Sequence, residues 1–195
     1  MRLSSYELPP RRRQRAFVRL TRALGAELDD VGKAALRRPE LFGRPFLDFA
    51  HVLLRGPSVW SVGERELFAA VVSQANRCQF CVGTHSEIAA KELGHDVLAD
   101  LHNGPLSPRA GAAASFIEAL TRDPDAVSAE DVKRARAAGV EEDALTEAIY
   151  VAFMFNTINR VADALGFEHH SERDRRRGAE ALRRLGYRLP PFLLR

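Results

Sequence analysis

The sequence predicts an all-α protein, and three observations support this fold class. Apolar residues recur at three- and four-residue spacing in nearly every segment, which is typical of amphipathic helices. No stretch of alternating apolar and polar residues is bounded by the turn signals of a β-hairpin. Glycines and capping residues stand where the helical patterns break, so the periodic segments have recognisable ends.

The expected elements follow in order from these patterns. Residues 1–10 contain two consecutive prolines and predict an extended tail. Gly94, Gly139 and Gly166 each lie where a helix should end, and Ser128 followed by acids should cap the start of another. Helices are expected at 12–25, 29–37, 44–54, 62–75, 78–92, 95–102, 107–121, 128–138, 142–165 and 170–185.

Two parts of the chain resemble each other weakly. GERELFAAVVSQAN, which later reaches AAKELG, is similar to EEDALTEAIYVAFMFN, which later reaches VADALG. A duplicated helical hairpin would produce this echo, although helix composition alone often produces it as well. Only the first copy contains cysteines.

Length and composition limit the class of protein. A chain of 195 residues can bury a substantial core, and we expect 1–195 to form a single all-helical domain. The longest apolar run, at 148–155, is too short to span a bilayer, and the charged N-terminus does not have the pattern of a signal peptide. Two cysteines are too few for a secreted disulfide scaffold, so we expect a cytoplasmic protein.

Arginine is concentrated near both ends of the chain, in RRRQR at 11–15 and RDRRRG at 173–178. The formal net charge is only +3, and no aromatic residues alternate with the basic runs. These runs therefore predict solvated helix faces or subunit contacts, and nucleic acid is an unlikely partner.

Both cysteines lie in one short segment, ANRCQFCVGTH, with Cys78 and Cys81 three residues apart and His85 four residues further on. On a helix these three side chains would share one face. Asn76 would be a suitable N-cap, which would place both thiols in the first turn, where the helix dipole stabilises a thiolate. One sulfur could then attack a peroxide and the other could resolve the sulfenic acid to a disulfide, with His85 exchanging protons.

Two other interpretations of the cysteines stay open. Free cysteines are often buried and inert, and the surrounding helix is apolar. Two thiolates and one imidazole could also bind a metal ion, but no second C-x-x-C or H-x-x-H completes a tetrahedron, so we expect no metal site.

Glu66, Cys78, Cys81 and His85, within G-E-R-E-L-x7-A-N-R-C-Q-F-C-V-G-T-H, form a pattern that resembles the alkylhydroperoxidase D-like proteins of the carboxymuconolactone decarboxylase superfamily. It is most similar to their branch of peroxidase-related enzymes. The similarity extends over about residues 35–170 as a family-like core. The resemblance implies an all-helical fold with two related halves, a homo-oligomer, and thiol-dependent reduction of hydroperoxides without haem, flavin or another cofactor.

The resemblance also implies roles for these four residues. Cys81 would attack the peroxide, Cys78 would resolve the product, and His85 with Glu66 would relay protons. Helix position alone favours Cys78 as the attacking sulfur, so the order of the two thiols stays open. Some active members carry a histidine just before the second cysteine, where this chain has Phe80, which cannot exchange a proton.

Several polar or aromatic residues outside the motif need partners if they are buried. Asn156, Asn159 and Arg160 interrupt the apolar face of the helix expected at 142–165, and we expect Arg160 to pair with an acid. His51 is expected to be a partly buried histidine with a satisfied hydrogen bond. Trp60 should pack the loop that leads into the helix carrying Glu66.

The sequence therefore predicts an enzyme that reduces a hydroperoxide through Cys81 and Cys78 and then needs an external thiol or dithiol reductant. One alternative is a carboxymuconolactone decarboxylase-like enzyme, in which acid–base residues matter and the thiols do not. Another is a non-catalytic redox-sensing or binding protein, in which the same disulfide changes shape or assembly.

Overall fold

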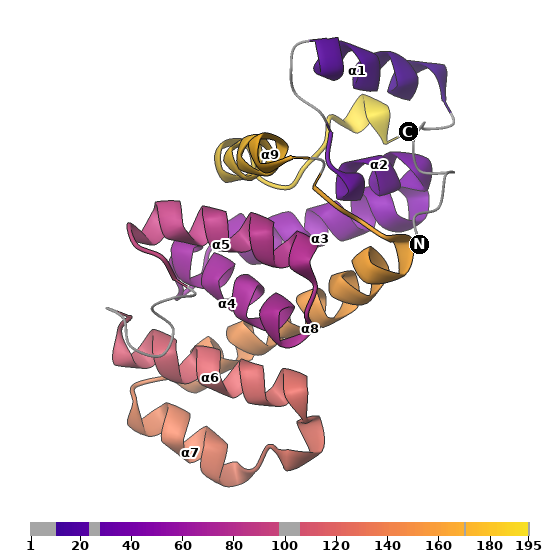
Figure 1. Cartoon of the computed structure of the whole chain (residues 1–195). Coiled ribbons are helices and arrows are strands. Elements are labelled where there is room, and N and C mark those ends of the chain that lie inside the picture. Colours follow the sequence, from indigo (N-terminus) through magenta and orange to yellow (C-terminus); the bar gives the residue numbers. More distant parts are fainter. Residues whose placement is uncertain (1–10, 24–27, 98–105, 170, 195) are drawn as a thin grey trace. The chain divides into compact units, whose positions relative to one another are not determined.

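A computed structural model describes residues 11–23, 28–97, 106–169 and 171–194 (Figure 1). All regular elements in these segments are helical and none of the described residues lies in a strand, which confirms the all-α prediction. The α-helices are α1 (Arg12–Ala23), α2 (Asp30–Arg37), α3 (Arg44–Arg55), α4 (Val62–Ala75), α5 (Gln79–Leu93), α6 (Pro108–Arg122), α7 (Ala129–Ala137), α8 (Glu142–Leu165) and α9 (Glu172–Leu185). Shorter elements are the π-helical turn Pro39–Gly43 and the 3₁₀ turns Pro124–Ala126 and Pro191–Leu193.

Most predicted helices have the expected position, and one of them needs correction. The helix expected at 95–102 does not begin where predicted, because residues 95–97 are not helical, and residues 98–102 lie outside the described segments, as does the expected tail at 1–10. The weak repeat in the sequence left a duplicated hairpin and shared helix composition open as explanations, and its second copy does not have the form of a hairpin. Residues 63–94 contain two helices joined by a turn, whereas α8 runs without a break from Glu142 to Leu165.

The chain divides into two compact units, Pro57–Val161 and the combination of Met1–Gly56 with Ala162–Arg195. The expected single domain stays a prediction, and each unit is taken by itself. No helix within the described segments combines the length and the hydropathy needed to cross a bilayer.

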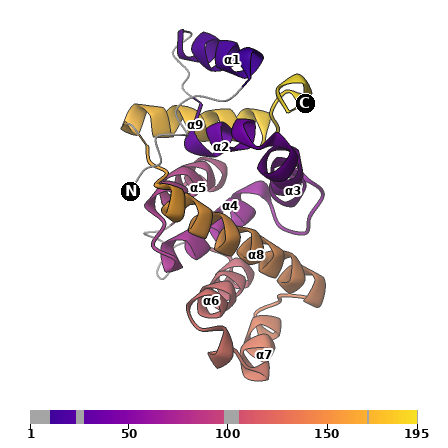
Figure 2. The ribbon, with the colours of Figure 1, turned by 90° about the vertical axis from the view of Figure 1, so that its right-hand side faces the viewer.

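In the unit Pro57–Val161, α4 is the central helix. It is buried on nearly every side, from Gly63 to Ser73, and packs against α5 and α6 (Figures 1 and 2). A helix that is apolar all round belongs inside a core rather than on a surface. Its start is fixed by a capping box, in which Ser61 and Glu64 bond to each other's backbone amides. Any polar side chain on the middle of α4 is consequently removed from water.

Trp60 fixes the loop that leads into α4, as expected from the sequence. Its indole is 2 % exposed and its Nε1 donates a hydrogen bond to the carbonyl of Ala144 at 2.8 Å. The ring packs edge-on against Phe68, and the guanidinium of Arg109 lies 4.1 Å from its centroid. These contacts connect the start of α4 to the first turns of α8 and to α6.

In the other unit, the two ends of the chain share a small core. Val18 of α1, Leu36 of α2 and Leu193 of the last 3₁₀ turn are all buried in contact with one another. Gln14 is fully buried among them, and its Nε2 donates to the carbonyl of Leu193 at 2.9 Å. This bond satisfies a polar group that would otherwise be costly to bury.

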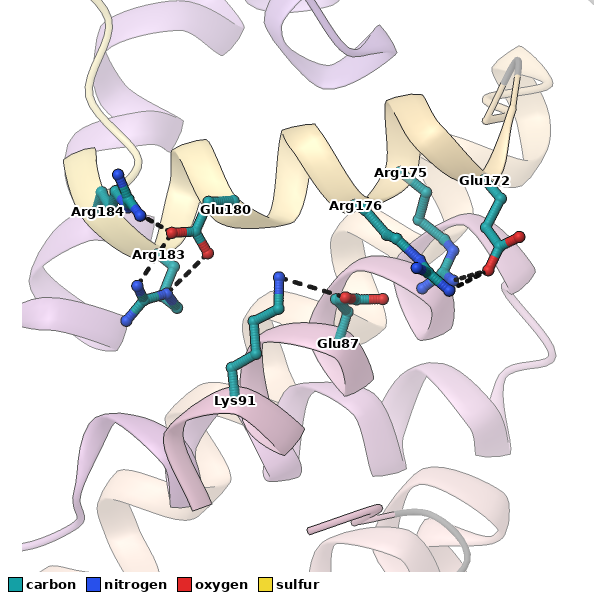
Figure 3. A network of polar contacts seen from close by, with 8 residues as sticks. All are labelled: Glu87, Lys91, Glu172, Arg175, Arg176, Glu180, Arg183 and Arg184. Carbon is teal, nitrogen blue, oxygen red and sulfur yellow. Dashed lines mark hydrogen bonds and ion pairs between the residues drawn. The ribbon is translucent and has the colours of Figure 1, made fainter. Parts of the chain in front are cut away.

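Helix α9 carries most of the second arginine-rich run on an exposed face. Arg173, Arg176 and Arg177 are exposed, in agreement with the prediction of a solvated helix face. Acidic residues partly neutralise the helix (Figure 3): Glu172 pairs with Arg175 and Arg176, and Glu180 with Arg183 and Arg184. The hydrogen bond from Arg183 is the main reason that the pKa of Glu180 falls to about 2.

The end of α9 is closed by Gly186, which packs against His51. Gly186 has φ +71° and ψ −160°, a conformation that is essentially restricted to glycine. Nδ1 of His51 accepts a 3.4 Å hydrogen bond from the next backbone amide, that of Tyr187, so His51 has the satisfied bond that was expected. Burial, with help from Arg188 and Arg55, lowers the pKa of His51, so the imidazole acts as a neutral acceptor.

We expect Gly186→Ala to destabilise the protein. A Cβ at this position would lie 2.5 Å from Nδ1 of His51, and the backbone would be strained as well. The expected loss is about 2 kcal/mol or more. Gly178→Ala in the interior of α9 is the matched control, because its added Cβ meets nothing within 4 Å and should stabilise by about 0.5–1 kcal/mol. Urea unfolding of the two variants measures this difference, and equal stabilities would contradict the packing described.

Candidate functional site

A buried carboxylate and a buried imidazole are in contact inside the unit Pro57–Val161. Glu66 lies on the central helix α4 and His85 lies on α5, and the two helices pack closely. Oε2 of Glu66 is 2.6 Å from Nδ1 of His85. Glu66 is fully buried and His85 is 7 % exposed. The structure thus joins two residues that the sequence separates by 19 positions.

This contact determines how the imidazole can act. An ionised Glu66 accepts the Nδ1 proton, which leaves Nε2 of His85 as the ring nitrogen that can accept a proton from another group. Phe155 of α8 packs edge-to-face on the imidazole, with ring centroids 4.6 Å apart and an interplanar angle of 82°. Hydrogen bond and aromatic contact together fix the orientation of the ring.

Cys81 and His85 share a face of α5, as predicted. They are four residues apart on the helix, and helical side chains lean toward the N-terminus. His85 therefore leans toward the turn that contains Cys81. Cys81 is the third residue of α5, among the first backbone amides, which have no partner within the helix.

The position of Cys78 differs from the prediction. Asn76 is not the N-cap of α5 but the C-cap of α4, and Cys78 itself is the N-cap of α5, with φ −82° and ψ 92°. Cys78 consequently lies just before the helical face shared by Cys81 and His85, instead of forming its first position. The link between α4 and α5 is consequently only the three residues Asn76, Arg77 and Cys78.

The turn that presents Cys78 is a Schellman motif. The amide of Cys78 donates to the carbonyl of Ser73, and the amide of Arg77 donates to the carbonyl of Gln74, each at 2.9 Å. This pattern requires a left-handed residue directly after the C-cap, and Arg77 supplies it with φ +62°. A residue with a Cβ pays about 1–2 kcal/mol for that conformation.

Glycine takes the same position in two similar helix ends of this chain. Gly139 and Gly166 follow α7 and α8 with positive φ, and each is bracketed by the same pair of backbone hydrogen bonds. Among described residues other than glycine, only Arg77 has a positive φ. The missing glycine explains why sequence reasoning did not find this turn.

A polar network connects the end of α4 to α8. Asn159 donates from Nδ2 to Oγ of Ser73 at 3.1 Å and accepts at Oδ1 from Nδ2 of Asn76 at 3.0 Å. Nδ2 of Asn76 also donates to Oδ1 of Asn156 at 2.9 Å. Arg160 donates to Oδ1 of Asn76 at 3.0 Å, so the partner found for Arg160 is an amide oxygen rather than the expected acid. The only sequence signal of the network was the polar interruption of α8.

Both thiols are reduced and deeply buried in this structure. Cys78 is 0 % exposed and Cys81 is 2 % exposed. Phe80 between them is also buried, at 7 % exposed. Within the segments that the structure describes, no group of three or more His, Cys, Asp or Glu side chains is arranged to hold a metal ion. The Glu66–His85 pair and the first backbone amides of α5 are polar groups on the helices next to the thiols.

Comparisons with known proteins agree with this architecture. The model of the carboxymuconolactone decarboxylase family matches residues 40–96, the part of the chain that contains Glu66, both cysteines and His85. A search of curated proteins gave no significant match. The resemblance noted in the sequence is thus confirmed over the segment that forms the site.

Two solved structures share the fold. An uncharacterized peroxidase-related protein from Silicibacter sp. TM1040 aligns with a TM-score of 0.72 and 24% identity, covering 87% of this chain and 91% of that one. The alkylhydroperoxidase AhpD core of an uncharacterized peroxidase-related protein from Ralstonia eutropha JMP134 aligns with a TM-score of 0.70 and 21% identity, covering 84% and 88%. The chain therefore has the alkylhydroperoxidase D-like helical fold.

We expect Arg77→Gly to stabilise the protein, because glycine adopts the left-handed conformation without steric cost. The expected gain is about 0.5–1 kcal/mol, since the greater entropy of glycine in the unfolded chain offsets part of the relief. Arg77→Ala keeps the Cβ and is the matched control, with little expected change. Thermal and urea unfolding measure both variants, and a Gly variant no more stable than the Ala variant would contradict strain at this residue.

Proposed function

We propose that the protein is a thiol peroxidase that reduces hydroperoxides with Cys81 and Cys78. The Cys81 thiolate attacks the terminal oxygen of the hydroperoxide, the O–O bond breaks, and the alcohol leaves after taking up a proton. Cys81 becomes a sulfenic acid. The Cys78 sulfur then attacks the Cys81 sulfur, forming a disulfide and releasing water. An external thiol or dithiol returns both cysteines to the reduced state.

The observation that carries this proposal is the buried Glu66–His85 contact, one helical turn after Cys81. A thiol must lose its proton before it attacks, and the leaving alkoxide must gain one. His85 oriented by Glu66 can serve both transfers through its Nε2. Phe80 cannot exchange protons, so this work falls to the His85–Glu66 pair.

The geometry also supports Cys81 as the attacking sulfur. Cys81 shares a helical face with His85, whereas Cys78 is the N-cap that precedes this face. The backbone of Cys78 is tied into the turn after α4. A sulfur held next to the attacking one is suited to the resolving role.

Burial of both thiols limits how an oxidant reaches them. A hydroperoxide can contact sulfurs that are 0 % and 2 % exposed only when neighbouring side chains move. We therefore expect small hydroperoxides to react faster than bulky ones.

The proposal further includes a cytoplasmic location, where thiol reductants are available, and assembly into a homo-oligomer.

We expect one equivalent of hydrogen peroxide to give an intramolecular disulfide between Cys78 and Cys81. Mass spectrometry of the alkylated protein should show the loss of two hydrogens and protection of both cysteines. Cys81→Ser should abolish turnover, whereas Cys78→Ser should accumulate a Cys81 sulfenic acid that dimedone traps. Wild-type protein with both thiols still free after this treatment would rule out the mechanism.

A second function is favoured by the family match and by the burial of the thiols. The matched family is named for decarboxylation of a carboxylated lactone, and the match includes Glu66 and His85. An imidazole oriented by a carboxylate can exchange protons with carbon as well as with sulfur. In this reaction Cys78 and Cys81 would be buried packing residues.

Two variants separate the two functions. The double variant Cys78→Ser/Cys81→Ser should lose all peroxide turnover, and retained activity on a carboxylated lactone would instead establish the decarboxylase. Glu66→Gln should slow either reaction by about 100-fold, because a neutral amide no longer holds the imidazole in its basic tautomer. Glu87→Gln is the control on α5, since it makes the same change of carboxylate to amide at a residue that pairs with Lys91 (Figure 3), and it should leave the rates unchanged.

A further inference from the structure

The strained turn before Cys78 is bound at two points by one buried side chain. Asn159 of α8 is 0 % exposed and bonds to Oγ of Ser73 and to Nδ2 of Asn76. Ser73 supplies the carbonyl that receives the amide of Cys78, and Asn76 is the C-cap directly before Arg77. The two residues that frame the turn are thus held at a fixed distance by a single planar amide.

The other side chains of the network bond to only one of the two residues that frame the turn. Asn156 and Arg160 both bond to Asn76, and neither of these bonds involves Ser73. Ser73 also donates to the carbonyl of Ala69 at 2.7 Å, which orients its hydroxyl oxygen as the acceptor for Asn159. Asn159 is therefore the residue that connects both ends of the turn.

We propose that Asn159 is a positioning residue for the resolving step, and this inference rests on the proposed peroxidase function. Left-handed Arg77 makes the turn costly by about 1–2 kcal/mol, so without a brace the segment relaxes toward conformations that move Cys78. By bridging Ser73 and Asn76, Asn159 keeps the Cys78 sulfur within reach of oxidised Cys81. Asn159 does not contact the reacting sulfurs and acts through the turn.

Two reactions compete for the Cys81 sulfenic acid. The ratio of their products, disulfide to sulfinic acid, depends on the position of Cys78. In one, the Cys78 thiolate attacks the Cys81 sulfur, the S–S bond forms, the S–O bond breaks, and hydroxide leaves as water after protonation. In the other, a second hydroperoxide transfers an oxygen to the sulfenic sulfur, giving sulfinic acid and an alcohol. Displacing Cys78 slows only the first reaction, because only that reaction depends on the distance between the sulfurs.

The test treats the full chain with graded excesses of hydrogen peroxide and measures disulfide and Cys81 sulfinic acid by mass spectrometry. We expect wild type to give mainly disulfide. Asn159→Ala should lower the ratio of disulfide to sulfinic acid on the order of tenfold, since misplacing a reacting group by about 1 Å can cost about 100-fold in rate. The rate at which Cys81 is first oxidised, measured by dimedone trapping in a Cys78→Ser background, should not change.

Controls separate positioning from a loss of stability. Trp60→Phe removes a buried hydrogen bond to Ala144 in the same unit without touching the turn, and it should leave the ratio unchanged. Adding Arg77→Gly to Asn159→Ala should restore the ratio, because glycine holds the left-handed turn without a brace. Ser73→Ala breaks the same bridge with a smaller change and decides the test where Asn159→Ala does not fold.

Each outcome has a separate meaning. A ratio that falls in Asn159→Ala and Ser73→Ala but not in Trp60→Phe supports the inference. An unchanged ratio in both turn variants, or an equal fall in Trp60→Phe, overturns it while leaving the peroxidase function intact. A wild-type protein that forms neither disulfide nor sulfinic acid overturns the peroxidase function and the inference together.

Discussion

The contact between Glu66 and His85 is the constraint on which the rest of the site depends. A carboxylate in an apolar core is costly unless a hydrogen bond compensates the loss of water, and its 2.6 Å contact with Nδ1 of His85 provides that bond. The contact requires α4 to be central and α5 to pack closely against it. The capping box of Ser61 serves this requirement, because it fixes the start of the helix that carries Glu66.

The sequence predicted the helices well because their information is local. Apolar periodicity, the capping sequence after Ser128 and the glycines that follow α5, α7 and α8 each act within a few residues, and the structure has helix ends at these places. The four candidate residues Glu66, Cys78, Cys81 and His85 were selected by their spacing and by a resemblance to a known family. Spacing alone did not show that Glu66 and His85 touch, because that contact depends on how α4 packs against α5.

The errors of the prediction also come from contacts between helices that are distant in the sequence. Asn76 is a good helix N-cap by composition, but its side chain bonds to Asn156 and Asn159 of α8, more than 75 positions away in the sequence. Arg77 carries no mark of a left-handed residue, since glycine usually stands there and the backbone hydrogen bonds of the turn cannot be read from side chains. Tertiary contacts thus changed the local preference at the one loop that presents a cysteine.

In the proposed redox cycle, the placement of Cys78 also determines which part of the chain must move. Its amide is fixed to Ser73, and the turn is fixed to α8, so Cys78 has little freedom to approach Cys81. Cys81 lies in the first turn of α5, where fewer hydrogen bonds within the helix hold the backbone than in its middle. Closing an S–S bond would therefore shift the first turn of α5 toward a stationary Cys78. His85 lies one turn further along, in the regular part of the helix, and would keep its bond to Glu66 throughout. In the proposed mechanism, the proton relay and the resolving residue would then stay in place while one short turn carries the reacting sulfur toward them.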